Sequence, residues 1–398
     1  MAVTVAQLTE RSHSLWAAYE RSVDWRRGGF WAIDAAGDPV SNIKTTFGAA
    51  RMVHSYALAS LDSFAGAAPI VEHGLKFLRT TLRDPDHAGW FADDRGVDAD
   101  DGTKSAYDHA FVLLASATAT LAGFDADDLM DEALGLFQTR LLDSAGLAGS
   151  RWSRDWKVAD TYRGANSNMH LMEALLAAYD ATGSRDLLEA GRGIGRSFER
   201  VARSHDWRLP EHYDRHWVPQ LEYNRARPHD VFRPYGSTPG HSAQWARLFL
   251  QANLGSEPET RVRMTSSAIS LIDRAMSDSW DSERGGMIYT VDWDGTPVSR
   301  VRLHWPVAEA ISVTAALSRV TGLARFASWQ EKLWAFVDRR LIDSPDRPWI
   351  HELNNQDEIS EEVLQGRPDL YHSIQATIAP RVRLRASYAA GLLDDPPR

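Results

Sequence analysis

The stretch that decides the fold is Tyr235-Gly-Ser-Thr-Pro-Gly-His-Ser-Ala-Gln-Trp-Ala-Arg-Leu-Phe-Leu250. It opens with turn residues around the Pro239-Gly240 pair and continues as an apolar segment. In that segment Trp245, Leu248 and Phe249 follow the i, i+3, i+4 spacing that gives a helix one buried face. The stretch therefore predicts a tight turn that leads directly into a buried helix.

A Gly- and Trp-rich turn of this kind is repeated along the chain. The turns start at Asp24, Asp84, Asp143, Asp206, Asp281 and Asp343. The steps between these starts are about 60, 59, 63, 75 and 62 residues. Such steps lie within, or slightly above, the spacing of repeat architectures. The sequence therefore consists of six similar units.

Each unit is predicted to contain two helices, one before its turn and one after it. The helices that follow the turns have polar starts and small apolar bodies, and span Thr45–Ser60, Lys104–Thr120, Arg163–Gly183, Tyr235–Asn253, His304–Gly322 and Asp369–Val382. The helices that precede the turns have a charged face, and span Val5–Arg21, Pro69–Arg83, Asp127–Leu142, Arg185–Arg203, Pro258–Ser279 and Leu323–Leu341. An open α-solenoid also pairs helices in this way. The count of six and the polar starts favour an all-α (α/α)6 barrel, with six inner and six outer helices in a single domain spanning 1–398.

Composition narrows the class of partner. The chain has 398 residues, a formal net charge of −10 and no cysteine. An acidic chain without a basic stripe argues against nucleic-acid or anionic-membrane partners. Without cysteine there is neither a disulfide nor a thiolate nucleophile. No signal peptide or membrane-spanning run is recognisable, so we expect a cytoplasmic protein, with both monomer and homodimer left open.

Unusual polar residues lie near the starts of the predicted inner helices, and in a closed ring these starts meet at one mouth. They are Arg51, Tyr107, Asp108, His109, Asn166, Asn168, His170, His241, Gln244, His304, Trp305, Glu309 and His372. Aromatic rings stack on the C–H faces of a sugar, while amides and carboxylates bind its hydroxyls. Taken singly, each histidine and Trp305 can also be an ordinary core residue. Arg51 is harder to explain by packing, because a charged arginine is rarely buried without a partner or ligand.

Several blocks of the sequence resemble the N-acylglucosamine 2-epimerase superfamily, and within it the D-mannose isomerase and aldose–ketose isomerase branch. The blocks are Arg163-Gly-Ala-Asn-Ser-Asn-Met-His-Leu-Met-Glu-Ala174, Glu222-Tyr-Asn-Arg225, Phe232-Arg-Pro-Tyr-Gly236, Pro239-Gly-His241, His304-Trp-Pro-Val-Ala-Glu309 and Asp369-Leu-Tyr-His372. The resemblance covers essentially the whole chain and implies an (α/α)6 barrel. It also implies interconversion of D-mannose and D-fructose, with D-lyxose and D-xylulose as a further pair, through a cis-enediol. The substrate would be an unphosphorylated monosaccharide, and neither metal nor cofactor would be needed.

The resemblance also implies roles for individual residues. His372 and His241 would be the acid/base pair, and His372 would move the proton between C2 and C1. His170 would assist ring opening, and Arg51 would polarise O1 or O2. The residues that would hold the sugar are Phe47, Tyr107, Asn166, Trp305 and Glu309. Histidine suits proton transfer because its pKa lies near working pH, and the developing oxyanion needs a fixed donor.

Gln244 departs from the family pattern. The family usually has glutamate three residues after the histidine of its Pro-Gly-His motif, where a carboxylate can face the imidazole one turn away. A neutral amide at Gln244 can orient His241 but cannot stabilise its imidazolium. From this we expect His241 to be a weak base and Gln244→Glu to raise kcat.

Four other functions stay open at this point. A 2-epimerase that converts mannose to glucose would use the same types of catalytic residue. A sulfoquinovose isomerase would need a cation beside C6, such as Arg233 or Arg225. An inverting glycoside hydrolase would need two carboxylates about 6.5–9.5 Å apart, such as Glu309 with Asp108 or Asp214, and would leave the histidines unused. A catalytically silent sugar-binding protein would be consistent with Gln244.

Overall fold

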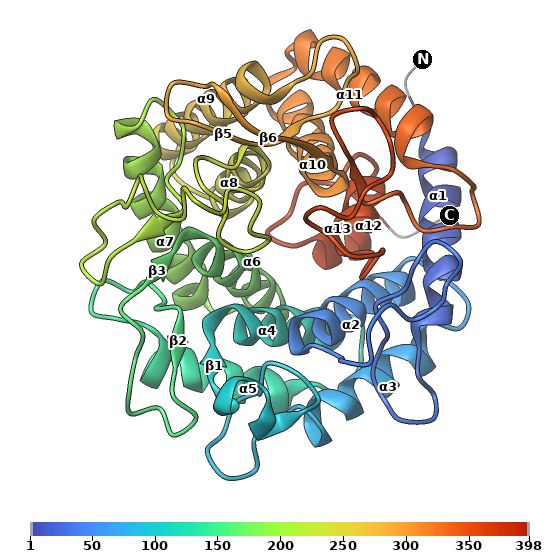
Figure 1. Ribbon diagram of the computed structural model, residues 1–398, viewed down its shortest axis with the longest axis vertical. Helices are drawn as coiled ribbons and strands as arrows, with labels where there is room; N and C mark the ends of the chain where they lie inside the picture. Colours follow the sequence, from blue (N-terminus) through green and yellow to red (C-terminus); the bar gives the residue numbers. More distant parts are fainter. Residues whose placement is uncertain (1–2, 396–398) are drawn as a thin grey trace.

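The computed structural model describes residues 3–395, whose helices form two concentric rings (Figure 1). The inner ring consists of α2 (Thr46–Leu61), α4 (Ala106–Leu121), α6 (Ala165–Thr182), α8 (Pro239–Ala252), α10 (His304–Thr321) and α12 (Tyr371–Ile378). The outer ring consists of α1 (Val5–Tyr19), α3 (Ala67–Thr80), α5 (Asp127–Leu136), α7 (Arg185–Ser204), α9 (Pro258–Ser279) and α11 (Ala324–Phe336). The predicted (α/α)6 barrel is confirmed. The single-domain prediction for 1–398 stays a prediction, and it includes residues 1–2 and 396–398, which lie outside the described part.

Short strands join the turns on the side where the inner helices begin. The pairs are β1 (Lys104–Ser105) with β2 (Arg151–Trp152), and β3 (Arg163–Gly164) with β4 (His212–Tyr213). A three-stranded antiparallel sheet has the order β5 (Ile288–Val291), β6 (Pro297–Leu303), β7 (Glu352–Leu353). The all-α prediction did not include these strands. Most of them pair segments about 40 to 50 residues apart, as in Arg163 with Tyr213, so no local pattern announces them.

The inner helices pack closely because their facing residues are small. Ala50 and Ala57 on α2, Ala115 on α4, Ala177 on α6 and Ala310 on α10 are all fully buried. Larger side chains fill the space between the two rings, where core burial stabilises the fold by about 25 cal/mol for each Å² of apolar surface. The core is therefore an annulus, and the polar starts of the inner helices are left facing the middle of the ring.

An ion pair, buried in the first two cases, links three of the turns to the segment that precedes the following inner helix. Lys44 contacts Asp24 at 2.6 Å, Lys104 contacts Asp84 at 2.8 Å, and Arg367 contacts Asp343 at 3.1 Å. The cation lies two to four residues before its helix in each case. These pairs fix where α2, α4 and α12 start, and so where their first-turn side chains point.

The tie at Asp84 gives a stability prediction. Lys104 and Asp84 have fully buried side chains, and Arg154 also binds Asp84. Asp84→Asn keeps the side-chain oxygen that accepts the backbone N–H of Asp86 but removes the charge facing Lys104. We expect the free energy of unfolding to fall by about 3 kcal/mol, because a buried ammonium loses its counter-ion. Chemical denaturation monitored by circular dichroism measures this change.

Asp86→Asn is the matched control for that experiment. The Asp86 carboxylate also binds Arg154, but its side chain is 65% exposed. Exposed ion pairs contribute about 0–1 kcal/mol, so this variant is expected to stay close to wild type. Equal losses of unfolding free energy in the two variants would show that the buried ion pair contributes no more to stability than the exposed one.

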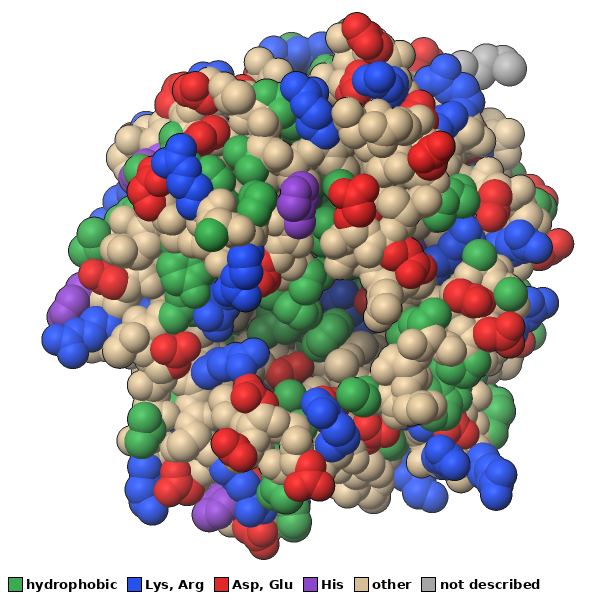
Figure 2. Space-filling view, in the orientation of Figure 1, with side chains coloured by type: hydrophobic (Ala, Val, Ile, Leu, Met, Phe, Trp, Pro, Cys, Tyr) green, Lys and Arg blue, Asp and Glu red, His purple; other side chains and the backbone are tan. Residues whose placement is uncertain are grey.

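The mouth of the barrel lies on the face drawn in Figure 2, where the surface is hollowed near the middle of the ring. Among residues 3–395, no helix has both the length and the apolar character needed to cross a membrane. The hollow in the middle of the ring is concave, as ligand-binding sites are.

Candidate active site

A cavity of about 250 Å³ opens beside the starts of α2, α4 and α6. Three predicted sugar-binding residues line it, namely Phe47, Tyr107 and Asn166. Side-chain caps fix the helix starts that carry Phe47 and Tyr107: Thr45 accepts the Gly48 N–H at the start of α2, and Ser105 accepts the Asp108 N–H at the start of α4. The loops add further lining residues, Tyr162, Phe232 and Arg233. Aromatic walls with a few polar groups suit a small polar ligand with apolar faces.

Tyr107 stands between this cavity and the predicted catalytic residues. Its ring centroid is 5.9 Å from that of Phe232 on the cavity side and 5.3 Å from that of His170 on the other side. Its hydroxyl accepts a hydrogen bond of 2.8 Å from Arg51. The cavity therefore adjoins the group of histidines instead of containing them.

Arg51 is held by one carboxylate and stacked among aromatic rings. Its Nη1 donates to Asp369 Oδ2 at 3.0 Å, and its guanidinium lies 4.4 Å from the centroid of Phe111 and 4.9 Å from that of Tyr371. Burial is the largest single influence on the pKa of Asp369 and raises it, but Arg51, His372 and the hydrogen bonds to the carboxylate together lower it below its usual value. The buried Nε–H of Arg51 has no partner among the described residues. Arg51 thus remains charged and has one donor left over.

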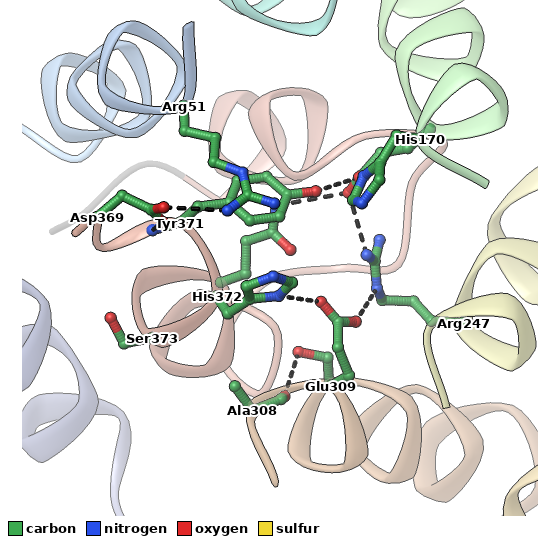
Figure 3. A network of polar contacts seen from close by, with 12 residues as sticks. Arg51, His170, Arg247, Ala308, Glu309, Asp369, Tyr371, His372 and Ser373 are labelled. Atoms are coloured by element: carbon green, nitrogen blue, oxygen red, sulfur yellow. Dashed lines mark hydrogen bonds and ion pairs between the residues drawn. The ribbon is translucent and has the colours of Figure 1, made fainter. Parts of the chain in front are cut away.

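His372 lies on α12 with its Nδ1 bonded to a buried carboxylate, Glu309 Oε1, at 2.9 Å (Figure 3). Burial, with a further contribution from Arg51, holds the pKa of His372 well below its usual value. The imidazole is therefore neutral near pH 7. When it donates its Nδ1–H to Glu309, its Nε2 carries a free lone pair, which is the state a general base requires.

His241 has the same arrangement on a different helix. It begins α8, and its Nδ1 lies 2.9 Å from Oε1 of Glu211, which is buried next to β4. The ring of Trp305 is close to both imidazoles, 5.0 Å from His241 and 5.7 Å from His372 between centroids. The structure thus brings two carboxylate-bound histidines next to one indole ring.

His170 lies deeper, on α6, and is held less tightly. Its Nδ1 is 3.5 Å from Glu173 Oε2 and makes no hydrogen bond. Burial lowers the pKa of His170 to about 4, so it is also neutral at pH 7. Figure 3 shows it across the Tyr371 side chain from Asp369, on the same side as Arg247. A neutral imidazole beside Tyr107 whose Nδ1 makes no hydrogen bond can accept a proton from a ligand oxygen or donate one to it.

Two sequence-based assignments need revision on this geometry. We expected His241 to lack a carboxylate partner, but Glu211 supplies one from outside the helix. The side chain of Gln244 is fully buried, and neither its oxygen nor its nitrogen has a partner among the described residues. Glu309, expected to hold the sugar, is 1% exposed and binds His372 and Arg247 instead. It is placed to orient His372.

The contact between Glu211 and His241 reverses the expected effect of Gln244→Glu. Because Glu211 already balances His241, Gln244→Glu would add a second carboxylate in a fully buried position, and we expect kcat to stay level or fall. Glu211→Gln removes the charge that stabilises the imidazolium, and we expect kcat to fall about 10- to 100-fold, as for other groups that orient a catalytic or metal-bound histidine. Steady-state kinetics of both variants measure these effects. A rise in kcat for Gln244→Glu would restore the original expectation.

No ligand set for a metal or cofactor can be named from these side chains. Among residues 3–395, no three His, Asp or Glu side chains are grouped as metal ligands. The expectation that neither group is needed stays a prediction. The chemistry that the site can perform with its own residues is proton transfer, with a fixed guanidinium for a developing negative charge.

Comparison with known proteins places this site in a family. The family described as N-acylglucosamine 2-epimerase (GlcNAc 2-epimerase) matches residues 28–376. The chain belongs to this family. A D-mannose isomerase of Thermobifida fusca is 40% identical over 94% of this chain and 93% of its own length, and one of Pseudomonas cannabina pv. alisalensis is 37% identical over 92% and 90%. A crystal structure of a D-mannose isomerase superposes with a TM-score of 0.88 at 26% identity, covering 98% of both chains.

The family resemblance expected from the sequence is thus confirmed. Most of the residues that the alternative functions would need are engaged in other contacts. Asp214 caps a turn, where it accepts the backbone N–H of His216 at 2.8 Å, and Glu309 is committed to His372 and Arg247. Arg225 pairs with Glu222 on the surface. Of the candidate hydrolase carboxylates, only Asp108 lines the cavity, where burial raises its pKa to about 6.

Several important residues of this family member were not singled out in the sequence. Glu211 lies 30 residues before His241, and only the pairing of β3 with β4 brings it close. Glu173, three residues after His170, had a local signal in that spacing. Arg247 had one too: a charged residue within the apolar run of an inner helix.

Proposed function

We propose that the protein is an aldose–ketose isomerase that interconverts D-mannose and D-fructose. The observation that supports this most directly is the pair of histidines next to Trp305, His241 and His372, each bonded through Nδ1 to a buried carboxylate. Two such bases serve a reaction that removes a proton and returns it. The D-mannose isomerases at 37% and 40% identity point to the same chemistry.

The first chemical step is opening of the pyranose ring, which needs a proton at the ring oxygen and a base for the anomeric hydroxyl. His170 and His241 are placed for this task near Tyr107 and Trp305 respectively. The aromatic rings would contact the C–H faces of the sugar, and Asn166 would bind a hydroxyl through its buried Oδ1, which has no partner among the described residues.

The second step moves a proton between neighbouring carbons. Nε2 of His372 removes the proton from C2, and the carbonyl oxygen O1 gains the negative charge of a cis-enediolate. The proton on O2 moves to O1, which passes through the cis-enediol and leaves the charge on O2. Return of the proton from His372 to C1 then yields the ketose, with its carbonyl at C2. Arg51 would stabilise the oxyanion, because its charge is fixed and its Nε–H is free to donate. Glu309 would stabilise the imidazolium of His372 while the proton resides there.

A 2-epimerase is the second candidate, since proton return to the opposite face of C2 would use His241 and His372 in turn. The positions of these two residues next to Trp305 fit both outcomes. The D-mannose isomerases at 37% and 40% identity support the isomerase as the first proposal. The oligomeric state and the cytoplasmic location stay predictions from the sequence.

Product analysis tests the proposal. The protein is incubated separately with D-mannose, D-lyxose and D-glucose, and the products are quantified by chromatography against standards. We expect fructose from mannose and xylulose from lyxose. Glucose as the main product from mannose would replace the isomerase with the epimerase, and inertness toward all three sugars would overturn both. A sulfonated hexose serves as a further substrate, since Arg233 lines the cavity.

A further inference from the structure

Arg247 is a buried cation that the mechanism above does not use. It lies on α8, and its side chain is 2% exposed. Its Nε donates to Glu309 Oε2 at 3.1 Å, its Nη2 donates to Glu173 Oε1 at 3.0 Å, and its Nη1 donates to Gln251 at 2.8 Å. Figure 3 shows the contact of the guanidinium with Glu309, which in turn contacts His372. One arginine therefore bridges the partner of His372 and the neighbour of His170.

The buried cluster contains more negative than positive charge. Two buried carboxylates share a single guanidinium, so one negative charge remains in a place that water does not reach. Glu173 is further stabilised by hydrogen bonds from Tyr371 and Gln375. Burial is the largest influence and raises the pKa of Glu173, but Arg247, together with His170 and Tyr371, brings the net pKa below its usual value; the pKa of Glu309 stays raised, mainly by burial. Glu309 is therefore the carboxylate that takes up a proton first if the cation is lost.

The surrounding groups do not supply a replacement cation. The titratable groups that face the cluster are Tyr371 and His372 from α12, His170 from α6, His54 and Arg51 from α2, and Tyr388 from α13 (Tyr388–Asp394). The histidines among them are held neutral by burial, which lowers their pKa values. Arg51 is already paired with Asp369.

We propose that Arg247 is a positioning residue that keeps Glu309 and Glu173 ionised together and so fixes His372 in the tautomer whose Nε2 is free to act as base. The catalytic consequence rests on the proposed function, whereas the tautomer does not. With Arg247 in place, ionised Glu309 accepts the Nδ1–H of His372. Without it, protonated Glu309 donates to Nδ1 instead, the ring proton moves to Nε2, and the base is lost.

The tautomer can be measured without any substrate. In protein labelled with ¹⁵N-histidine, NMR distinguishes protonated from unprotonated ring nitrogens, and His372→Gln assigns the signals. At pH 7 we expect wild-type His372 to be protonated at Nδ1 and bare at Nε2. Arg247→Met is expected to exchange the two. The double variant Arg247→Met/Glu173→Gln, which removes the second carboxylate along with the cation, is expected to restore the wild-type tautomer at least in part.

Arg381→Met is the matched control, because Arg381 and Asp62 form another buried ion pair, with side chains 5% and 0% exposed, that does not touch the site. It is expected to lower stability and leave His372 unchanged. If Arg247→Met does not fold, Arg247→Lys provides the test: an ammonium cannot bridge both carboxylates as a guanidinium does. We expect its kcat to fall about tenfold or more, with KM changed less than twofold and the acid limb of kcat moved to higher pH.

The outcomes separate this proposal from the proposed function. An unchanged His372 tautomer in Arg247→Met, or a double variant no closer to wild type than the single one, overturns the positioning role. An unchanged kcat and pH profile in Arg247→Lys does the same. A wild-type protein that converts no mannose overturns the proposed function instead, and the NMR result then still decides the role of Arg247.

Discussion

Replacing His372 with alanine is expected to lower kcat for sugar isomerisation about 10³- to 10⁴-fold while the fold stays intact. General acid/base catalysis by a positioned side chain contributes at most about 10⁴-fold, and His372 has the geometry for the full effect. Its Nδ1 is anchored on Glu309 and its imidazole is neutral because burial lowers its pKa. Steady-state kinetics with D-mannose measure the loss, and circular dichroism confirms the fold.

His216→Ala controls for the loss of a histidine as such. His216 is exposed in a surface turn and bonds only to neighbours in that turn. It is expected to keep wild-type kcat and KM. A His372→Ala variant within tenfold of wild type would contradict the role given to His372, and His241 would then have to be the base for C2.

Lowering the pH from 6.5 to 5 is expected to unfold the protein, or to bring it close to unfolding. Seven histidines are buried in the described part of the fold: His54, His109, His170, His212, His304, His351 and His372. Burial lowers the pKa of every one of them, to about 4 for His54 and His170 and to about 3 for His109 and His304. The folded state therefore keeps them neutral at a pH where the unfolded chain binds protons.

The loss of stability at low pH arises because the folded and unfolded states bind different numbers of protons. Stability rises with pH wherever the unfolded state binds more protons, so it falls as the pH drops from about 6.5 toward 4. Each buried histidine then costs roughly 2 kcal/mol at pH 5, since one unit of pKa difference is about 1.4 kcal/mol. The six with the largest pKa shifts, which exclude His212, together cost about 12 kcal/mol, comparable with the entire stability of an ordinary domain. Carboxylates titrate mainly at lower pH and add to the loss there.

Urea denaturation at a series of pH values measures this dependence. His109→Gln removes one titrating group far from the catalytic histidines; its ring accepts the Trp90 N–H and contacts the Ser105 carbonyl oxygen. The variant is expected to be less stable at pH 7.5 but to show a shallower pH dependence, by about one proton. Stability that is flat between pH 7 and 5 would show that these histidines titrate normally in the folded protein.

Much of the fold could be predicted because it is written in local pattern. The spacing of Gly- and Trp-rich turns and the apolar helical segments give all twelve barrel helices within a few residues, as for α9, predicted and found over Pro258–Ser279. The strands and α13 were not predicted. They are short, and their stability comes from contacts across the mouth or against the barrel, not from their own sequence.

The site was predictable where a side chain lies in the first turns of an inner helix, as for Phe47, Tyr107 and His372. It was not where the partner comes from elsewhere. The i, i+3 spacing of His241 and Gln244 suggested a pair on one helix, whereas Glu211 reaches the imidazole across a strand pair. Glu309 shows the other difficulty: its residue type fits a sugar ligand, and only its burial reveals that it serves His372.

The central claim is a proton transfer between C2 and C1 of a sugar by the protein's own histidines. Its most direct test is proton and carbon NMR of D-mannose incubated with the protein in D₂O. We predict D-fructose with solvent deuterium at C1 and remaining mannose with deuterium at C2, because a base that takes the proton exchanges it with solvent. Fructose formed without any deuterium, or mannose left unchanged, would contradict the account.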